Sequence, residues 1–392
     1  MEDIELYADR EATWVKHEIL KQYLQKLAYK LGWWHAVINY VDGFAGPWQH
    51  RSEALTDTSP YIAIRELRAA KEGLARHGRA PRSFRCFFIE KDKKAYQTLT
   101  SSFLQTVTDM EIKSLNGEFE QHIADVLQFA GRHFTFFFID PTGWTGFGMN
   151  AISPILKYVP GEVLINFMTK DIKRFVDDPN SMALSAYNDL FGAADYRRHW
   201  QGLTGQDRED KIVETYSQRV KAAGGFTHVA NTIVLHPRDA RTHFHLVYAT
   251  RSREGLRAFR DVEAKVMKEQ ARVRAQAQQT HRTARTSQLP LFGADEPGDS
   301  RHFEQLRVRY LTNSQAVVQA TLEARKRISF DELEEVALAM PMTWESDVKA
   351  WIKSWQQQGL AHIEGLAPRA RVPQRDSKHF IVWSAIQPGA AR

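Results

Sequence analysis

Short apolar runs alternate with amphipathic segments through the first 250 residues of the chain. Residues with helical spacing predict helices at 14–31, 61–77, 93–106, 120–129 and 149–158. Between them lie runs that are apolar on both faces, namely AVINYV at 36–41, FRCFFIE at 84–90, FTFFFID at 134–140 and EVLINFM at 162–168, with a shorter strand near 111–115. Strands buried on both faces have this pattern. The alternation predicts an α/β protein with a Rossmann-like, doubly wound parallel sheet.

The next part of the chain changes character twice. Residues 170–225 are helical in pattern and rich in polar and aromatic side chains, which predicts a helical insertion or cap over the sheet. Two adjacent strands, at 227–236 and 243–250, then predict a hairpin. An antiparallel pair at the end of a parallel sheet lets the chain leave the sheet without another crossover.

The remainder of the chain predicts a second domain. A helix at 254–275 completes a first domain of residues 1–275, and the stretch 276–300, rich in Gln, Thr, Gly and Pro, is typical of a linker. Residues 301–392 predict three helices and then two strands around a basic loop at 368–378. This order is typical of a winged helix-turn-helix domain. A generic helical packing module is the alternative.

Composition narrows the class of protein. The 392 residues, 43% of them hydrophobic, suffice for two domains with ordinary cores. Cys86 is the single cysteine, so neither a disulfide nor a cysteine-based metal cluster can form within one chain. The N-terminus is charged, and no later stretch approaches the length that spans a bilayer. These features predict a cytoplasmic protein.

The formal net charge of +6 is unevenly distributed. Residues 251–290 contain ten basic and four acidic residues, whereas residues 1–250 are balanced. A concentrated basic segment such as this can bind a phosphate-rich partner, which makes nucleic acid an expected partner. A solvated helix face gives the same pattern and stays open as an alternative.

Polar residues and glycines follow the ends of the first four predicted strands. They are Asp42, Gly43, Phe44, Ala45 and Gly46, then Glu90, then Asn116, Gly117 and Glu118, then Asp140 and Pro141. Ligands of open parallel sheets bind outside these carboxyl ends. The row fits a nucleoside cofactor, because glycines let the backbone approach a ligand and a carboxylate binds ribose hydroxyls. Each element alone is also typical of a turn or a helix cap.

Two common nucleotide-binding motifs do not fit this row. The turn lacks G-x-G-x-x-G, and no Lys-Ser or Lys-Thr follows the glycines as in a P-loop. With its terminal hairpin, the arrangement resembles the class I S-adenosylmethionine-dependent methyltransferases. The resemblance implies that the turn 42–46 holds the methionine part of the cofactor, Glu90 the ribose and residues 116–118 the adenine region. It also implies that Asp140 and Pro141 face the methyl acceptor.

A closer resemblance covers roughly residues 10–260. The segments YVDGFAGP, FFIEKD, FFFIDPTGW and LINFM, together with Lys16 in the first helix, resemble the three-Cys-motif partner (TcmP) family. The three cysteines of that name belong to a radical-type partner protein, so the resemblance implies such a partner. Methyltransferases of this kind usually carry another glycine two places after Gly46, where this chain has Trp48. An indole there can narrow or cover the cofactor pocket.

The segment DPTGW at 140–144 also resembles the Asp-Pro-Pro-aromatic motif of enzymes that methylate exocyclic amines of bases. In those enzymes the acid and a proline carbonyl accept hydrogen bonds from the amine, and the aromatic ring stacks on an extruded base. The resemblance implies catalytic roles for Asp140, Pro141 and Trp144. Lys16, which stands in the segment that resembles the TcmP family, is a further candidate, with a surface position as the alternative. Here the aromatic residue falls one place later, and Thr-Gly replaces the second proline. A strand-ending turn and a core anchor are the alternative interpretations.

Two weaker features concern a metal and a protein partner. His243 and His245 alternate on one strand face, but a metal site needs a third ligand that the sequence does not identify, and no metal is expected. Within the linker, the apolar stretch from Gln288 to Phe292 resembles peptides that dock on the replication sliding clamp. Packing of Leu291 and Phe292 on their own domain is the alternative.

These features support three hypotheses. The first is an S-adenosylmethionine-dependent methyltransferase acting on nucleic acid, with a base amine as the methyl acceptor. The second is a catalytically inactive methyltransferase fold that binds DNA or serves as an assembly partner of a radical-type three-Cys protein. The third is a small-molecule methyltransferase, since nothing in 170–225 identifies a substrate.

Overall fold

The chain forms two compact units. The computed structural model describes residues 4–47, 50–79, 82–175, 181–286 and 301–384. One unit spans Met1–Asp299 and the other Ser300–Arg392, and each has its own hydrophobic core. The first unit carries the sheet and the candidate site.

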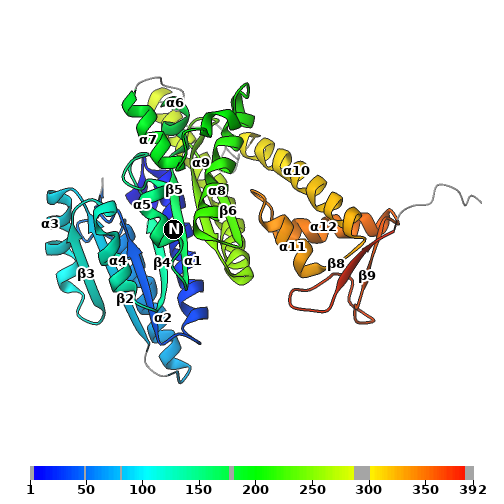
Figure 1. Ribbon diagram of the computed structural model, residues 1–392, viewed down its shortest axis with the longest axis horizontal. Coiled ribbons are helices and arrows are strands. Elements are labelled where there is room, and N and C mark those ends of the chain that lie inside the picture. Colours follow the sequence, from blue (N-terminus) through cyan, green and yellow to red (C-terminus); the bar gives the residue numbers. More distant parts are fainter. Residues whose placement is uncertain (1–3, 48–49, 80–81, 176–180, 287–300, 385–392) are drawn as a thin grey trace, which may run out of the picture. The chain divides into compact units, whose positions relative to one another are not determined.

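A seven-stranded sheet forms the centre of the first unit (Figure 1). Its strands are β1 Val37–Asp42, β2 Ser83–Glu90, β3 Glu111–Asn116, β4 Phe134–Ile139, β5 Gly161–Phe167, β6 His228–Leu235 and β7 Thr242–Thr250. They lie in the order β3-β2-β1-β4-β5-β7-β6. Only β7 runs against its neighbours, pairing antiparallel with both β5 and β6. The predicted α/β class, with a parallel sheet that ends in an antiparallel hairpin, is confirmed.

The middle strands are apolar because both of their faces are covered. Every residue of β4 (FTFFFI) and of β5 is buried. In a sheet with helices on both sides, alternate side chains enter two different cores, so no polar face remains. This is why these strands were visible as continuous apolar runs.

Helices cover both faces of the sheet. One layer consists of α1 Glu11–Leu31, α2 Ser59–Arg76 and α9 Arg253–Thr286, and the other of α4 Ile123–Ala130, α5 Met149–Leu156 and α8 Gly205–Gly224. Helix α3, Lys93–Ser102, packs against β2 and β3. The carboxyl ends of the parallel strands lie at the edge from which the loops of the candidate site emerge.

The range 170–225 is only partly an insertion. It contains α6 Thr169–Phe175, α7 Ser181–Phe191, the short 3-10 helix η4 Tyr196–His199, and α8. Ile212, Val213 and Val220 of α8 are buried in the core against the sheet. Because β6 runs parallel to β5, the chain needs a crossover between them, and α8 is that crossover helix. The sequence expectation of a cap therefore applies at most to the elements before α8.

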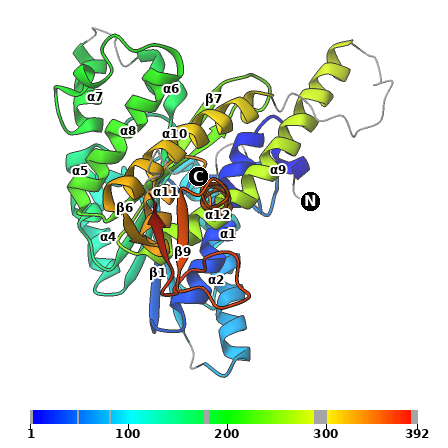
Figure 2. The same cartoon turned by 90° about the vertical axis from the view of Figure 1, so that its right-hand side faces the viewer.

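Helix α9 is longer than predicted (Figure 2). It continues to Thr286, so the beginning of the predicted linker 276–300 is helical. The segment after Ala275 is rich in Gln, Arg and Ala, which are good helix formers, and it lacks Gly and Pro. The composition of this segment predicted a linker, whereas its helix propensity favoured a helix, and the segment is helical as far as Thr286.

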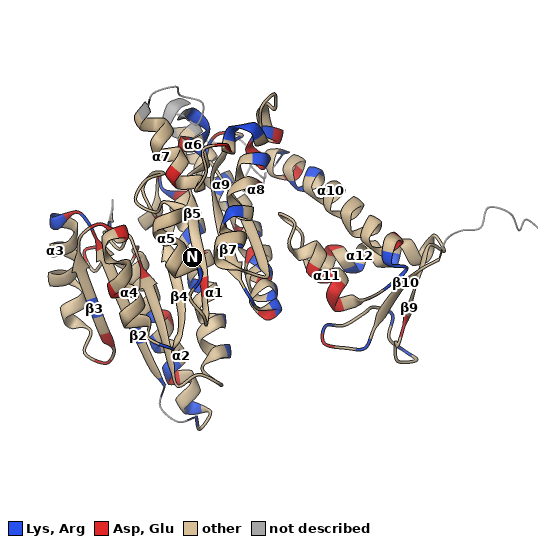
Figure 3. Cartoon of the chain, in the orientation of Figure 1, with Lys and Arg blue, Asp and Glu red and all other residues tan. Residues whose placement is uncertain are grey.

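The basic segment on α9 does not form one exposed face. Arg260 and Arg274 are almost fully buried, with 1% and 4% of their surface exposed. Arg260 donates to the carbonyl of Asn231 at 2.9 Å, and Arg274 to that of His236 at 2.9 Å. Over the ribbon of the sheet unit, basic and acidic residues are interspersed (Figure 3). Part of the predicted nucleic-acid surface therefore serves to join α9 to β6 and the following turn.

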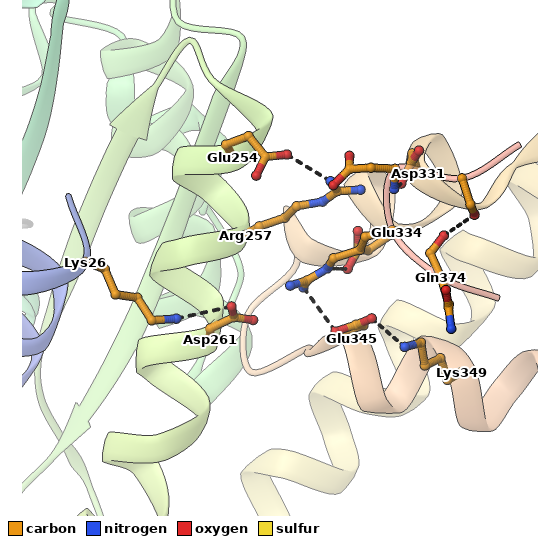
Figure 4. Close-up of polar contacts among 12 residues, drawn as sticks. Lys26, Glu254, Arg257, Asp261, Asp331, Glu334, Glu345, Lys349 and Gln374 are labelled. Atoms are coloured by element: carbon orange, nitrogen blue, oxygen red, sulfur yellow. Dashed lines mark hydrogen bonds and ion pairs between the residues drawn. The ribbon is translucent and has the colours of Figure 1, made fainter. Parts of the chain in front are cut away.

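Ion pairs add further contacts along α9. Lys26 of α1 lies 3.2 Å from Asp261, measured from Nζ to Oδ2 (Figure 4). Arg257 lies 2.9 Å from Glu254 one turn earlier on the same helix. A half-exposed pair such as Lys26 and Asp261 contributes little stability. The buried apolar side chains of α9, among them Leu256, Phe259 and Val262, hold the helix in place.

The second unit is a small helical domain with a three-stranded sheet. Its elements are α10 Arg301–Arg325, β8 Arg327–Ser329, α11 Phe330–Leu338, α12 Glu345–Gln357, β9 Ala361–Glu364 and β10 Phe380–Trp383. The strands pair antiparallel in the order β8-β10-β9. Ser329 caps α11 in a capping box with Glu332. The three helices and two of the strands were predicted, whereas the short β8 was not.

Two expectations from the sequence concerned the single cysteine and membrane-spanning segments. Cys86 is a free, buried cysteine in β2, and burial raises the pKa of its thiol. In the part of the chain that the structure describes, no helix combines the length and apolarity needed to cross a bilayer.

Candidate active site at the carboxyl edge of the sheet

A cavity of about 410 Å³ opens at the carboxyl edge of the sheet. Phe44, Gly46 and Glu90 line it on the side of β1 and β2, and Asp140 and Asn166 line it on the side of β4 and β5, following the strand order. These residues follow or end β1, β2, β4 and β5. The structure therefore brings together side chains from four strands at the edge where the sequence predicted a ligand.

The glycine turn after β1 is fixed between two neighbouring strands. The amide of Gly43 donates to the carbonyl of Phe138 at 3.1 Å, and that of Ala45 to Ile89 at 2.9 Å. A Cβ on Gly43 would lie 2.7 Å from the ring of Phe119. Close approach, rather than an unusual backbone angle, requires glycine at this position.

Gly46 has the same requirement on the cavity side. A Cβ there would lie 2.2 Å from Oε2 of Glu90. The bare backbone of the turn and the carboxylate of the second strand thus lie against each other. The sequence predicted the turn and this carboxylate as the cradle of a cofactor, and that role stays a prediction.

Asp42 lies below the cavity rather than in its lining. It is fully buried, accepts a hydrogen bond from Ser59 Oγ at 2.7 Å, and accepts one from the amide of Phe44 at 3.1 Å. Burial raises the pKa of the Asp42 carboxyl to about 7, although both hydrogen bonds oppose the shift. Asp42 therefore shapes the turn from within.

Glu90 ends β2 and faces the cavity. Its Oε1 accepts the amide hydrogen of Asp92 at 2.7 Å. Burial raises the pKa of the Glu90 carboxyl, and its backbone hydrogen bonds oppose this shift. A carboxylate held in this way presents its remaining lone pairs to a ligand.

The third predicted segment lies beside Glu90 and outside the described lining of the cavity. Asn116 Nδ2 donates to the carbonyl of Glu90 at 2.7 Å, and the amide of Gly117 donates to the same carbonyl at 3.0 Å. Glu118 is exposed. A Cβ on Gly117 would lie 2.3 Å from Nε2 of His122. The segment supports the back of Glu90, and its role toward an adenine stays a prediction.

Asp140 is held by two side chains from other elements. Lys16 Nζ of α1 lies 2.5 Å from Oδ2, and Asn166 Nδ2 of β5 donates to Oδ1 at 2.7 Å. The side chains of Lys16 and Asp140 are only 11% and 12% exposed. Lys16 of the first helix and Asp140 at the end of β4 thus form an ion pair although they are 124 positions apart in the sequence, a pairing that the sequence did not predict.

The two remaining catalytic candidates lie in different places. Pro141 is buried and lines the cavity. Trp144 stacks on Tyr187 of α7, with ring centroids 5.6 Å apart, and packs against the core. It is absent from the described lining of the cavity, as the core-anchor alternative anticipated, and a stacking role toward a base stays a prediction.

Several residues of the cavity were missed by the sequence analysis. Asn166 lies inside the apolar strand β5, where the run LINFM marked it as a strand residue only. His243 and Phe244 lie near the start of β7. Because β7 is antiparallel, its beginning reaches the carboxyl edge of the parallel strands. The sequence predicted this antiparallel hairpin, so the position of His243 and Phe244 at the start of its second strand could have indicated that they lie at this edge.

The remaining candidates from the sequence are the histidine pair, Trp48 and the stretch from Gln288 to Phe292. Among the described residues, no group of three His, Cys, Asp or Glu side chains could hold a metal ion. His245 is buried and paired with Thr169, with 2.6 Å between Nδ1 and Oγ1. Trp48 and the stretch from Gln288 to Phe292 lie outside the described residues.

No protein-family model matches this sequence, and no curated protein matches it. Among solved structures, a Legionella pneumophila protein described as DUF519 has 9% identity and a TM-score of 0.37, covering 64% of this chain and 91% of its own. Loganic acid methyltransferase with SAH has 11% identity and a TM-score of 0.31, with 68% and 91% covered. Both scores are low, so the class of fold rests on the strand order and directions given above. A mostly parallel sheet that ends in an antiparallel hairpin is what the resemblance to class I methyltransferases predicts.

Proposed function

We propose that the chain is an S-adenosylmethionine-dependent methyltransferase that acts on nucleic acid, at an exocyclic amine of a base. The observation that carries the proposal is one cavity, at the carboxyl edge, that residues following or ending four strands share. Its first end, on the side of β1 and β2, has the glycine turn and Glu90, and its second end, on the side of β4 and β5, has Asp140 and Asn166. A donor and an acceptor bound at these two ends would meet within it.

The first end suits the cofactor. The turn 42–46 offers bare backbone at Gly46 for the methionine part, and the Glu90 carboxylate can accept both ribose hydroxyls. Asn116, Gly117 and Glu118 beside Glu90 are the candidates for the adenine. The bound cofactor supplies a methyl group already activated on a sulfonium. The protein then has to position the acceptor and exclude water.

The second end suits a nitrogen acceptor. Each carboxylate oxygen of Asp140 has two lone pairs, and Lys16 and Asn166 each use one. One lone pair on each oxygen remains for an amine hydrogen. In this arrangement Lys16 and Asn166 fix the direction in which the Asp140 carboxylate points.

The second unit supports nucleic acid as the substrate class. The element order α10-β8-α11-α12-β9-β10, with an antiparallel sheet, is that of a winged helix, and we propose this assignment. The loop between β9 and β10 exposes Arg369, Arg371 and Lys378. Among the residues described, none lies within ion-pair distance of these three. Unpaired cations on a projecting loop suit a phosphate backbone.

A second candidate function is a catalytically inactive assembly or DNA-binding partner of a radical-type three-Cys protein, as the TcmP resemblance implies. One observation favours it. Both oxygens of Asp140 are already engaged by the protein itself, one of them in an ion pair with little exposure. A carboxylate engaged in this way can serve the fold alone.

The first experiment asks whether the purified chain carries or binds the cofactor. Mass spectrometry of the native protein and titration calorimetry with S-adenosylmethionine should both detect it. Glu90→Gln should weaken binding by about tenfold, the equivalent of one lost charge-assisted hydrogen bond. Glu111→Gln, exposed at the opposite end of the neighbouring strand β3, is the matched control and should bind as wild type. No binding to the wild-type chain would refute the proposal.

A second measurement separates the two candidate functions. Methyl transfer from labelled cofactor is followed with unmethylated duplex DNA and with transcribed RNA as acceptors. Incorporation into either polymer supports the methyltransferase. Cofactor binding without incorporation into either favours the inactive partner.

A further inference from the structure

Asn166 lines the cavity, and its side chain carries a buried hydrogen-bond acceptor without a donor among the described residues. It is 2% exposed, and its Nδ2 donates to Asp140 Oδ1 at 2.7 Å. This bond fixes the orientation of the amide, because the reversed amide would set an oxygen against the carboxylate. No described residue donates a hydrogen bond to Asn166 Oδ1. A buried acceptor without a donor costs free energy, and a bound ligand with an N–H group would remove that cost.

A second unsatisfied group belongs to a lining residue of the neighbouring strand β7. His243, in β7, lines the cavity, and its Nδ1 is buried without a hydrogen bond from the described residues. The ring lies edge-on to His236, with centroids 5.5 Å apart. Burial lowers the pKa of His243 to about 4, with smaller contributions from Lys170, His236, Arg241 and Lys16. The imidazole is therefore neutral near pH 7 and can accept or donate one hydrogen bond, according to its tautomer.

Apolar groups border these two polar atoms. Phe44, Pro141, Met168 and Phe244 all line the cavity. The ammonium of Lys16 lies 5.9 Å from the centroid of the Phe244 ring. A flat aromatic ligand would contact these surfaces while its edge meets the polar atoms. An aliphatic amine or a free hydroxyl would use the polar atoms and leave the apolar lining without a partner.

We propose that Asn166 Oδ1 and His243 Nδ1 bind the edge of the methyl acceptor, and that this edge carries an exocyclic amine on an aromatic ring. The inference rests on the proposed function and deepens it. It names two binding residues and the chemical group that they select. The amine donates to Asn166 Oδ1 beside Asp140, and His243 contacts the neighbouring position on the ring.

The test compares nucleotides that differ only in the amine. Binding of adenosine 5′-monophosphate and of cytidine 5′-monophosphate is measured by calorimetry, each against its analogue lacking the exocyclic amine. Saturating S-adenosylhomocysteine occupies the cofactor end throughout. At least one amine-bearing nucleotide should bind about tenfold more tightly than its analogue, the equivalent of one hydrogen bond made to a buried group.

Variants assign the discrimination to these residues. His243→Phe and Asn166→Ala should each reduce the discrimination to about twofold or less. His133→Phe makes the same change at an exposed position just before β4, at the opposite edge of the sheet, and should discriminate as wild type. Circular dichroism and S-adenosylhomocysteine affinity check that each variant is folded. His243→Phe keeps a ring of similar size, so it remains informative even if Asn166→Ala unfolds the site.

Each outcome has a defined meaning. Equal binding of the paired nucleotides to wild type, no binding of any of them, or full discrimination in His243→Phe would overturn the inference. S-adenosylhomocysteine binding by the same protein would then leave the proposed function standing. If S-adenosylhomocysteine itself does not bind, the proposed function fails together with the inference.

Discussion

Asp42 shows how a single buried carboxyl can organise a ligand turn. Its side chain joins the turn to the first residue of α2, through the amide of Phe44 and the hydroxyl of Ser59. Burial favours the neutral form of this acid, and the pKa rises to about 7. The acid that the sequence placed in a ligand row is thus also a structural residue whose protonation is coupled to folding.

This coupling predicts a pH dependence of stability. The pKa of Asp42 in the folded state, about 7, is above the ordinary value of 3.8, so between these values the folded state binds more protons than the unfolded state. The stability that the folded protein gains from this proton is fully present below the pKa of the unfolded state. It is lost as pH rises toward 7. Asp42→Asn cannot lose a proton, so its stability relative to wild type should rise by about 2 to 3 kcal/mol between pH 5 and pH 8.

Urea unfolding at the two pH values measures this difference. The asparagine can still accept from the amide of Phe44 and donate to the hydroxyl of Ser59, so the geometry of the turn is retained. A stability difference between Asp42→Asn and wild type that is the same at pH 5 and pH 8 would contradict the prediction.

Gly46 predicts a direct effect on the cofactor end. In Gly46→Ala, the new Cβ would lie 2.2 Å from the Glu90 carboxylate, which must move. Overpacking of this kind costs about 1 to 3 kcal/mol, and S-adenosylmethionine affinity should fall by at least about tenfold.

Gly143→Ala is the matched control for this substitution. A Cβ at Gly143 would meet no atom within 4 Å, so cofactor affinity should stay close to that of wild type. If Gly46→Ala binds the cofactor as tightly as Gly143→Ala, the turn does not contact the ligand.

At the scale of elements, two basic segments differ in what their charges do. On α9, several arginines bond to backbone carbonyls of the sheet unit, as Arg260 and Arg274 do. In the loop between β9 and β10, Arg369, Arg371 and Lys378 are exposed. The loop is therefore the better candidate for phosphate contacts, although the helix contains more basic residues.

The loop predicts the salt dependence of duplex binding. Replacing Arg369, Arg371 and Lys378 together with alanine should weaken binding of duplex DNA uniformly across sequences. The slope of log K against log salt should fall by about 0.9 for each phosphate contact that is lost, or about 2 to 3 for all three.

A charge-matched control uses exposed cations of the sheet unit. Replacing Arg132, Lys157 and Lys221 with alanine removes the same number of charges and should leave the slope nearly unchanged. Equal slopes for the two triple variants would show that the loop makes no specific contribution.

At the scale of the whole molecule, each unit carries its own core. In the second unit, Val318, Leu322, Trp351 and Trp355 are buried together. A domain with its own core can fold alone. The fragment Ser300–Arg392 should therefore unfold in one cooperative transition, reported by the fluorescence of its buried tryptophans.

A shorter fragment, 327–392, is the control for this prediction. It lacks α10, and with it Val318 and Leu322 of the core. It should show no cooperative transition. If the two fragments behave alike, α10 is not required for the fold of the second unit.

The sequence by itself determined the class of the fold and the edge of the sheet where the polar residues at the strand ends gather. Strands buried on both faces must be apolar throughout, so β1, β2, β4 and β5 were visible without any tertiary information. The polar residues that end them must meet at one edge, because parallel strands point the same way. Glu90, Gly46 and Asp140 were predicted for this reason, and they line one cavity.

Tertiary structure alone decided which polar atoms face the cavity and which are used within the fold. Asn166 lies inside an apolar strand and His243 beyond an antiparallel turn, so no local pattern indicated that Asn166 meets Asp140 or that His243 lines the same cavity. The contacts of Arg260 and Arg274 likewise depend on where α9 lies against the sheet. Local periodicity encodes which face of an element is buried. Whether a charge finds a partner depends on elements distant in the sequence, and only the packed structure specifies them.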